Sequence, residues 1–187
     1  MKTIKTLGST IGILALCLLS CSKVDSSEVD LIGEQTYLQF KTANGKSDDT
    51  IYYTKWLKSG FPNSSKLASE IWDLPLIKHD YFNPTKDLIM VYGRKGNIFS
   101  IPVTLPQDNE SYSVELIQGA NGTTTRLRVT SLDLTGLQDI FFRPSGGASF
   151  RIVIVPSQKL LGLKASGLKN LEKMSHEEIA TYFGIRD

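Results

Sequence analysis

The dipeptide Asn121-Gly122 constrains the fold of this chain more than any other local feature. A two-residue type I′ turn requires positive φ at both central positions, and Asn-Gly is the pair that tolerates this best. With the turn placed there, three pairs face each other across the hairpin: Leu116 with Leu127, Val114 with Val129, and Glu115 with Arg128. The first two pairs share a buried face and the third is an opposite-charge pair in solvent. We therefore predict an antiparallel hairpin in which Arg126 and Arg128 point to solvent.

A second hairpin is predicted around Lys95-Gly96, which lies between two runs of alternating apolar residues. A two-residue turn at this position opposes three apolar pairs: Tyr92 with Phe99, Met90 with Ile101, and Leu88 with Val103. Pro102 cannot donate a hydrogen bond to a neighbouring strand, so we expect its strand to be an edge strand or to be bulged there.

Two further segments complete the predicted fold. Within residues 149–155 the four consecutive positions 152–155 are apolar, and the run stops at Pro156, which predicts a central strand covered on both faces. Ser175 and Glu178 have the spacing of a capping box, and Gly184 is a typical helix stop. We predict a mostly β fold, an antiparallel sandwich or sheet with a short C-terminal helix.

The N-terminus has the organisation of an export signal. Lys2 and Lys5 precede an apolar stretch over 7–19 that is too short to span a bilayer, and Leu18-Leu19-Ser20-Cys21 follows directly. This tetrapeptide resembles the lipobox of bacterial lipoproteins, in which the cysteine thiolate takes a diacylglyceryl group as a thioether. The resemblance implies cleavage before Cys21 and lipidation of that residue. The alternative is an ordinary secretory signal in which Cys21 has no role.

These features predict three regions: a signal peptide over 1–20, a lipidated tether over 21–33 and a single β-rich domain over 34–187. Residue 22 is serine rather than the aspartate that, in familiar Gram-negative lipoproteins, favours inner-membrane retention. The resemblance therefore implies an outer-membrane location, on either the periplasmic face or the cell surface. The chain has 21 Lys and Arg against 19 Asp and Glu, and loss of Lys2 and Lys5 would make the numbers equal. Without a basic excess, nucleic acid is not an expected partner.

The order of segments in the body resembles that of a group of small uncharacterised bacterial lipoproteins with a β-rich C-terminal domain. The segments that carry the resemblance are Asp73-Leu74-Pro75-Leu76-Ile77, residues 87–93, Ile101-Pro102, residues 139–142, residues 150–156 and the helix over 175–185. These are strand and turn patterns, so the resemblance implies a fold and no activity, and it supplies no site residues.

Residues for catalysis are few. His176-Glu177-Glu178 lacks the second histidine of a zinc-protease helix, and no serine lies in a nucleophile elbow. No glycine-rich phosphate loop or calcium-loop spacing is present, so no catalytic residue, metal site or cofactor is predicted. The alternative is a glycan-processing or other hydrolytic enzyme that uses a loop site near His79, beside Asp80.

Aromatic residues supply a candidate binding surface. Residues 52–82 are rich in rings, and we predict ligand contact by four of them: Trp56, Trp72, Tyr81 and Phe82. Rings on a β-sheet face are a common platform for stacking sugars or holding protein partners, although the same rings could simply fill the core. We therefore expect a lipid-anchored, non-enzymatic binding module for a glycan or an envelope protein. A structural lipoprotein without a small ligand is a third possibility.

Overall fold

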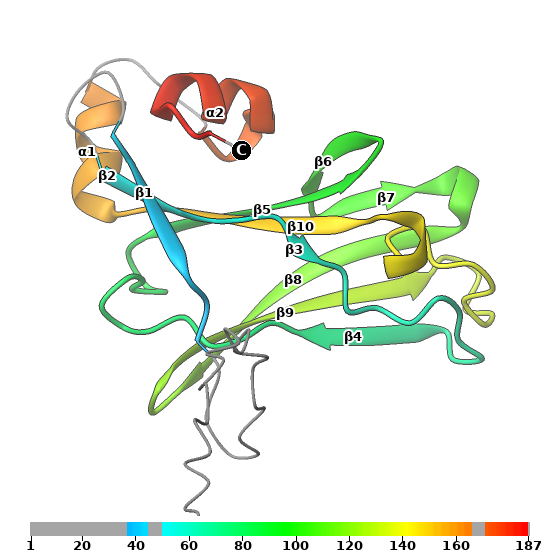
Figure 1. Ribbon diagram of the computed structural model, residues 1–187. Coiled ribbons are helices and arrows are strands. Elements are labelled where there is room, and N and C mark those ends of the chain that lie inside the picture. The colour runs from blue at the N-terminus through cyan, green and yellow to red at the C-terminus, as the bar shows by residue number, and fades with distance from the viewer. Residues whose placement is uncertain (1–36, 45–49, 166–170, 187) are drawn as a thin grey trace, which may run out of the picture. The chain divides into compact units, whose positions relative to one another are not determined.

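The computed structural model describes residues 37–44, 50–165 and 171–186 (Figure 1). They belong to one compact unit covering Gln35–Asp187, whereas the predicted signal peptide, Cys21 and the tether lie outside the described residues. The strands are β1 (Phe40–Asn44), β2 (Thr50–Thr54), β3 (Leu57–Lys58), β4 (Ser69–Asp73), β5 (Leu88–Lys95), β6 (Asn97–Ile101), β7 (Val103–Leu105), β8 (Glu110–Gly119), β9 (Gly122–Ser131) and β10 (Ser149–Val155). The helices are α1 (Ser157–Ala165) and α2 (His176–Phe183), with short 3₁₀ turns at Pro106–Asp108, Pro144–Gly146 and Leu171–Lys173.

The strands form two antiparallel sheets, which confirms the predicted mostly β class. One sheet has six strands in the order β1-β2-β10-β5-β6, with β3 also paired to β10, and the other has four in the order β4-β9-β8-β7. The chain passes from one sheet to the other at Pro102, between β6 and β7, through a cis peptide bond. Both of these strands lie at sheet edges, as the proline predicted.

A hydrophobic core fills the space between the two sheets. Alternate residues of β10, Phe150, Ile152 and Ile154, are buried in it together with Leu127 and Val129 from β9. All seven residues of β10 are buried, because helices cover the opposite face of this strand. This confirms the prediction of a central strand covered on both sides.

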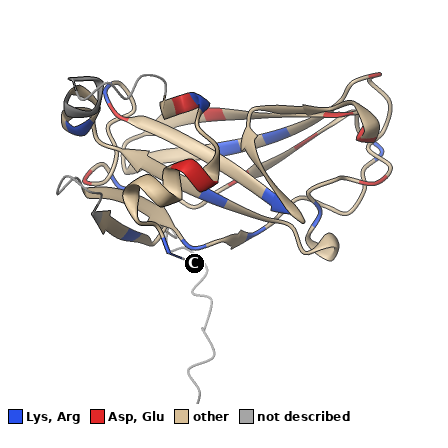
Figure 2. Ribbon diagram, turned by 90° about the horizontal axis from the view of Figure 1, so that it is seen from above, with Lys and Arg blue, Asp and Glu red and all other residues tan. Residues whose placement is uncertain are grey.

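The C-terminal helix α2 covers the outer face of the six-stranded sheet. Ile179 and Phe183 pack with Val153 and Val155 of β10 in a second buried cluster. Ser175 caps the helix through the predicted capping box with Glu178, and Gly184 ends it in the left-handed conformation. Seen from above, the ribbons carry interspersed basic and acidic residues (Figure 2).

The predicted register of the β5–β6 hairpin is wrong by one residue. Gly96 lies alone at the tip with a φ of +70°, and Lys95 pairs with Asn97. Val91 therefore faces Ile101, while Met90 and Tyr92 point to the opposite side, toward α2. Because β5 is covered on both faces, its apolar residues do not reveal which face meets the core, and the alternation could not select the register.

The predicted register of the β8–β9 hairpin is wrong by two residues. Gly119 pairs with Gly122, so that Ala120 and Asn121 form the turn, and Leu127 faces Val114 rather than Leu116. Gly122 has a φ of +151°, and a Cβ atom there would lie 2.4 Å from the carbonyl oxygen of Ile77. The glycine is therefore required by a contact with a distant segment. A shift of two residues keeps each side chain on its predicted face.

Glu115 illustrates the effect of this shift on the solvent face. It lies directly opposite Arg126 rather than Arg128, but its carboxylate still reaches Arg128 diagonally at 3.0 Å. Arg126 instead pairs with Asp73 of β4. Both arginines keep the predicted outward orientation.

Helix α1 was not predicted, because its apolar and polar residues are only weakly segregated around the helix axis. It follows Pro156, whose carbonyl accepts hydrogen bonds from the backbone N–H groups of Lys159 and Leu160. None of the helices in the described ranges is long and apolar enough to span a bilayer.

Candidate functional site

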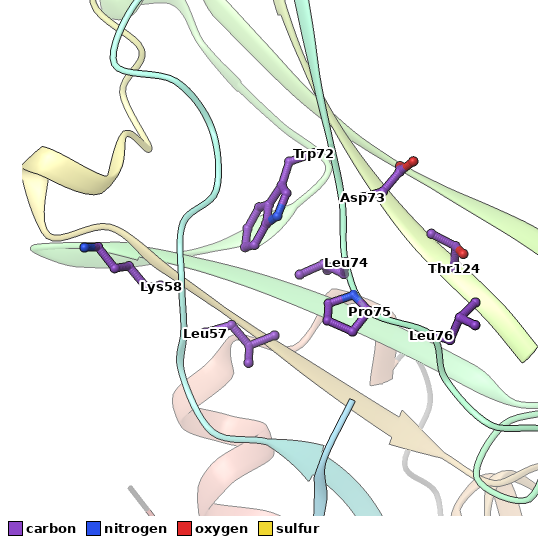
Figure 3. A pocket seen from close by; sticks show the side chains of 8 residues that line it. All are labelled: Leu57, Lys58, Trp72, Asp73, Leu74, Pro75, Leu76 and Thr124. Atoms are coloured by element: carbon purple, nitrogen blue, oxygen red, sulfur yellow. The ribbon is translucent and has the colours of Figure 1, made fainter. Parts of the chain in front are cut away.

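A cleft opens on the side of the body where β3 and β4, from different sheets, are not joined by hydrogen bonds (Figure 3). Its volume is about 680 Å³. The lining is mostly apolar and comes from β3, β4, the segment after β4 and β9: Leu57, Lys58, Trp72, Asp73, Leu74, Pro75, Leu76 and Thr124. The cleft is therefore a gap in the cover of the main core, with a hydrophobic floor and a polar rim.

The indole of Trp72 forms one wall of this cleft and is held in a defined position. A Cβ atom at residue 60 would lie 2.3 Å from the indole nitrogen, so only glycine lets the ring pack against the backbone there. Phe61 and Phe150 contact the ring edge-on, with centroid separations of 5.9 and 5.5 Å. A large ring that is fixed before binding loses little conformational entropy when it contacts a ligand.

Two residues of opposite charge border the cleft, Asp73 and Lys58, and the charge of Asp73 is balanced by a neighbouring arginine. The guanidinium of Arg126 donates two hydrogen bonds of 2.7 Å to the Asp73 carboxylate, and these lower the pKa of that carboxyl group below its usual value. Asp73 is therefore a neutralised anion. Lys58 lies on the opposite rim in β3 with its side chain exposed.

The first described residues of the chain lie at one end of the cleft. Tyr37 forms a parallel bridge with Leu76, and the N–H of Leu38 donates to the Leu76 carbonyl at 2.8 Å. From there the chain continues into β1 of the six-stranded sheet. The cleft is thus adjacent to the point at which the N-terminal segment joins the body.

The four aromatic residues predicted to bind ligand do not form one surface. Trp72 lines the cleft, whereas Phe82 is only 2% exposed and belongs to the core. Tyr81 is exposed and packs against Phe40 and Tyr52.

Trp56 lies on the opposite face of the six-stranded sheet from Trp72, beside α2. The guanidinium carbons of Arg94 and Arg151 lie 4.2 and 4.5 Å from its ring centroid, and the His176 ring lies 5.2 Å away. Protein groups therefore surround this indole.

The region around His79 forms a smaller pocket of about 240 Å³. The Nε2 atom of His79 lies 3.4 Å from the carbonyl oxygen of Ala120. The nearby Thr85 hydroxyl donates to the Asn83 side chain at 2.7 Å, so its proton is directed away from the imidazole. This arrangement does not pair a nucleophile with a base.

A buried carboxyl group lies at the start of β8, away from the cleft. Glu110 accepts hydrogen bonds from the Tyr112 hydroxyl at 2.6 Å and from the Phe141 N–H at 3.0 Å. Burial raises the pKa of Glu110 above its usual value, although these hydrogen bonds oppose the shift. Its bonds hold the segment after residue 140 against β8, which is a structural role. In the part of the chain that the structure describes, no group of three His, Cys, Asp or Glu side chains could hold a metal ion.

The other cleft residues were not predicted as site residues. The available signal was the alternation in Ser69-Glu70-Ile71-Trp72-Asp73, which forms β4 and places Trp72 on the inner face. Leu57 and Thr124 reach the same cleft only through the sheet topology. No family model, curated protein or solved structure matches the chain in the three comparisons made.

Proposed function

We propose that this chain is a lipid-anchored lipoprotein of the bacterial outer membrane that acts as a non-enzymatic binding module, with the cleft beside Trp72 as its binding site. Its ligand is an envelope glycan or an envelope protein, and its body is a β-sandwich. The proposal combines two independent features, the lipobox-like segment at Cys21 and the cleft in the described body.

The observation that carries the binding role is the environment of Trp72. Its indole borders a cleft of about 680 Å³, which falls within the size range of ligand sites, and it is seated against Gly60. Apolar contacts from Leu57 and Leu74 with charged groups on the rim suit a partner that is partly apolar and partly polar. Binding requires no catalytic group.

The anchor is supported by the chemistry of the N-terminus. A single acyl chain holds a protein to a membrane only reversibly, whereas the three chains of a mature lipoprotein make attachment effectively permanent. The predicted tether is polar, so it cannot replace the lipid. The chain from Cys21 to Tyr37 would place the cleft within roughly 55 Å of the membrane at full extension.

The anchor is tested by fractionating cells that express the wild-type chain or Cys21→Ala and measuring the intact mass of each product. We expect a membrane-bound, lipid-modified wild type, and either an uncleaved precursor or a soluble product from the variant. A soluble wild-type product with an unmodified N-terminus would refute the anchor and the location together.

The binding role is tested by screening the exported chain against an array of bacterial envelope glycans and a peptide library. We expect at least one class of probe to bind the wild type. The affinity of Trp72→Ala for that probe should be lower by about tenfold or more. Tyr81→Ala is the matched control, because it also removes a partly exposed ring but lies outside the cleft lining. If no probe binds in a Trp72-dependent manner, the cleft is not the binding site.

A further inference from the structure

Among the residues that the structure describes, no strand pairs with the outer edge of β4. Strand β4 pairs with β9 on one side and is the last strand of the four-stranded sheet. The N–H of Leu74 donates to Thr125, and the N–H of Ser131 donates to Ala68, which identifies the hydrogen-bonded pairs of this ladder. Such pairs recur at every second residue in an antiparallel ladder, so the N–H and C=O groups of Ile71 point away from β9.

The other edges of the two sheets differ from β4. Strand β7 is three residues long and lies between Pro102 and Pro106, and β6 ends directly before Pro102. Strand β1 carries Lys41. Prolines and lysines are the usual means by which proteins prevent another strand from adding to an edge. Strand β4 contains neither proline nor lysine, and its charged residues Glu70 and Asp73 accept hydrogen bonds from Ser65 and Arg126. The side chain of Ile71 is 42% exposed.

The cleft lies beside this free edge and on the inner side of β4. A strand added to β4 would direct every second side chain to the same face as Trp72, and therefore into the apolar cleft. The remaining side chains would lie on the solvent face, next to Ile71. The edge supplies main-chain hydrogen bonds and the cleft supplies side-chain contacts, which are the two components of β-strand addition.

The charges of the cleft indicate the character of the incoming segment. The Asp73 carboxylate is neutralised by Arg126, whereas Lys58 on the opposite rim is an exposed cation. The residues that line the cleft, taken together with Arg126, therefore carry a net positive charge, and an acidic side chain on the partner would complement it.

We infer that the partner of this lipoprotein is an extended polypeptide segment that adds as a strand to the free edge of β4, with alternate apolar side chains in the cleft and an acidic side chain beside Lys58. This inference rests on the proposed binding role and specifies its ligand class. A glycan would use the cleft but would not need the backbone groups of Ile71.

The test uses the exported chain, residues 21–187 with Cys21→Ser, and a phage-displayed library of peptides about ten residues long. We expect the selected peptides to alternate apolar and polar residues and to carry an acidic residue. Ile71→Pro removes one outward N–H and leaves the bonds to β9 in place, so it should weaken these peptides by about tenfold or more. Ile71→Thr, which keeps the N–H, should bind nearly as well as the wild type, and Lys58→Glu should bind less well.

Each other outcome overturns the inference in a distinguishable way. Peptides or glycans could bind Ile71→Pro and the wild type with equal affinity but fail to bind Trp72→Ala. The cleft would then bind ligand without strand addition, and only the proposed function would survive. If no peptide is selected while glycans bind, the partner is not a polypeptide.

Amide hydrogen exchange provides the second measurement. The Ile71 amide should exchange rapidly in the free chain and become protected when a selected peptide binds. Protection in the free chain would mean that its own N-terminal segment, or a second copy, already occupies the edge, and protection that rises with concentration would identify the second copy. Either result would overturn the inference.

Discussion

The gap between the two sheets is closed on one long side of the body and open on the other. On one side, β6 continues through Pro102 into β7, and aromatic rings fill the space behind this crossing. Phe142 contacts Phe99 at 5.8 Å and Tyr112 at 4.9 Å between ring centroids. On the other side, β3 and β4 stay separate, and Trp72 borders an open cleft. Aromatic residues thus seal the core where the chain crosses between the sheets, and Trp72 lines an open cleft where it does not.

The largest expected effect is on the closed side. Phe142 is fully buried, and its ring packs so tightly against Gly93 that a Cβ atom there would lie 2.8 Å from it. Phe142→Ala should lower the free energy of unfolding by about 3–5 kcal/mol, because it leaves a cavity that neighbouring rings cannot fill. Urea denaturation would measure this. A loss below about 1 kcal/mol would show that the closed side is not tightly packed.

On the open side, removal of a larger ring should have a smaller effect. Trp72 is only half-buried, and solvent can enter the space that its indole leaves. Trp72→Ala should lower the free energy of unfolding by about 2 kcal/mol, less than Phe142→Ala does. Trp72→Phe is the control, since it keeps an aromatic contact with Phe61. If Trp72→Ala were the more damaging of the two truncations, the contrast between the sides would fail.

A carboxyl group on each side, Glu110 and Asp73, should change the free energy of unfolding in opposite directions as the pH falls. The pKa of Glu110 is raised by burial, so its contribution to stability is present below the unfolded pKa and is lost as pH rises through the folded pKa. The pKa of Asp73 is lowered by Arg126, so its contribution is present above the unfolded pKa and is lost as pH falls.

Urea midpoints between pH 3 and 7 would test these signs. Relative to wild type, Glu110→Gln should gain stability as pH rises, and Asp73→Asn should gain it as pH falls. The same slope for both variants would contradict the assignment.

The smallest effect is expected on the solvent face of the four-stranded sheet. The Glu115–Arg128 pair is 3.0 Å long, with both side chains at least one-third exposed. Glu115→Ala should change the free energy of unfolding by well under about 1 kcal/mol, because exposed ion pairs contribute little. A clearly larger change in a denaturation curve would mean that the pair organises the β8–β9 ladder.

The two hairpins show which parts of the fold could be predicted from the sequence. The strands of the two hairpins, the buried strand β10 and the capped helix follow from local patterns, as do the faces of β8 and β9, and the structure contains them. The registers do not, because Gly122 is required by the distant carbonyl of Ile77 and because β5 is buried on both faces. The cleft could not be predicted for a similar reason, because Leu57, Trp72 and Thr124 come together only when the strands have paired into sheets.

The separation of the two tryptophans has a spectroscopic consequence. Trp72 borders the cleft between the sheets, whereas Trp56 lies across the six-stranded sheet, within 5.2 Å of the His176 ring at the start of α2. Indole emission depends on the polarity and mobility of the groups around the ring. A variant with Trp56→Phe would therefore report occupancy of the cleft by its fluorescence alone, and a variant with Trp72→Phe would report the docking of the C-terminal helix. The chain carries one intrinsic optical probe for each of its two hydrophobic layers.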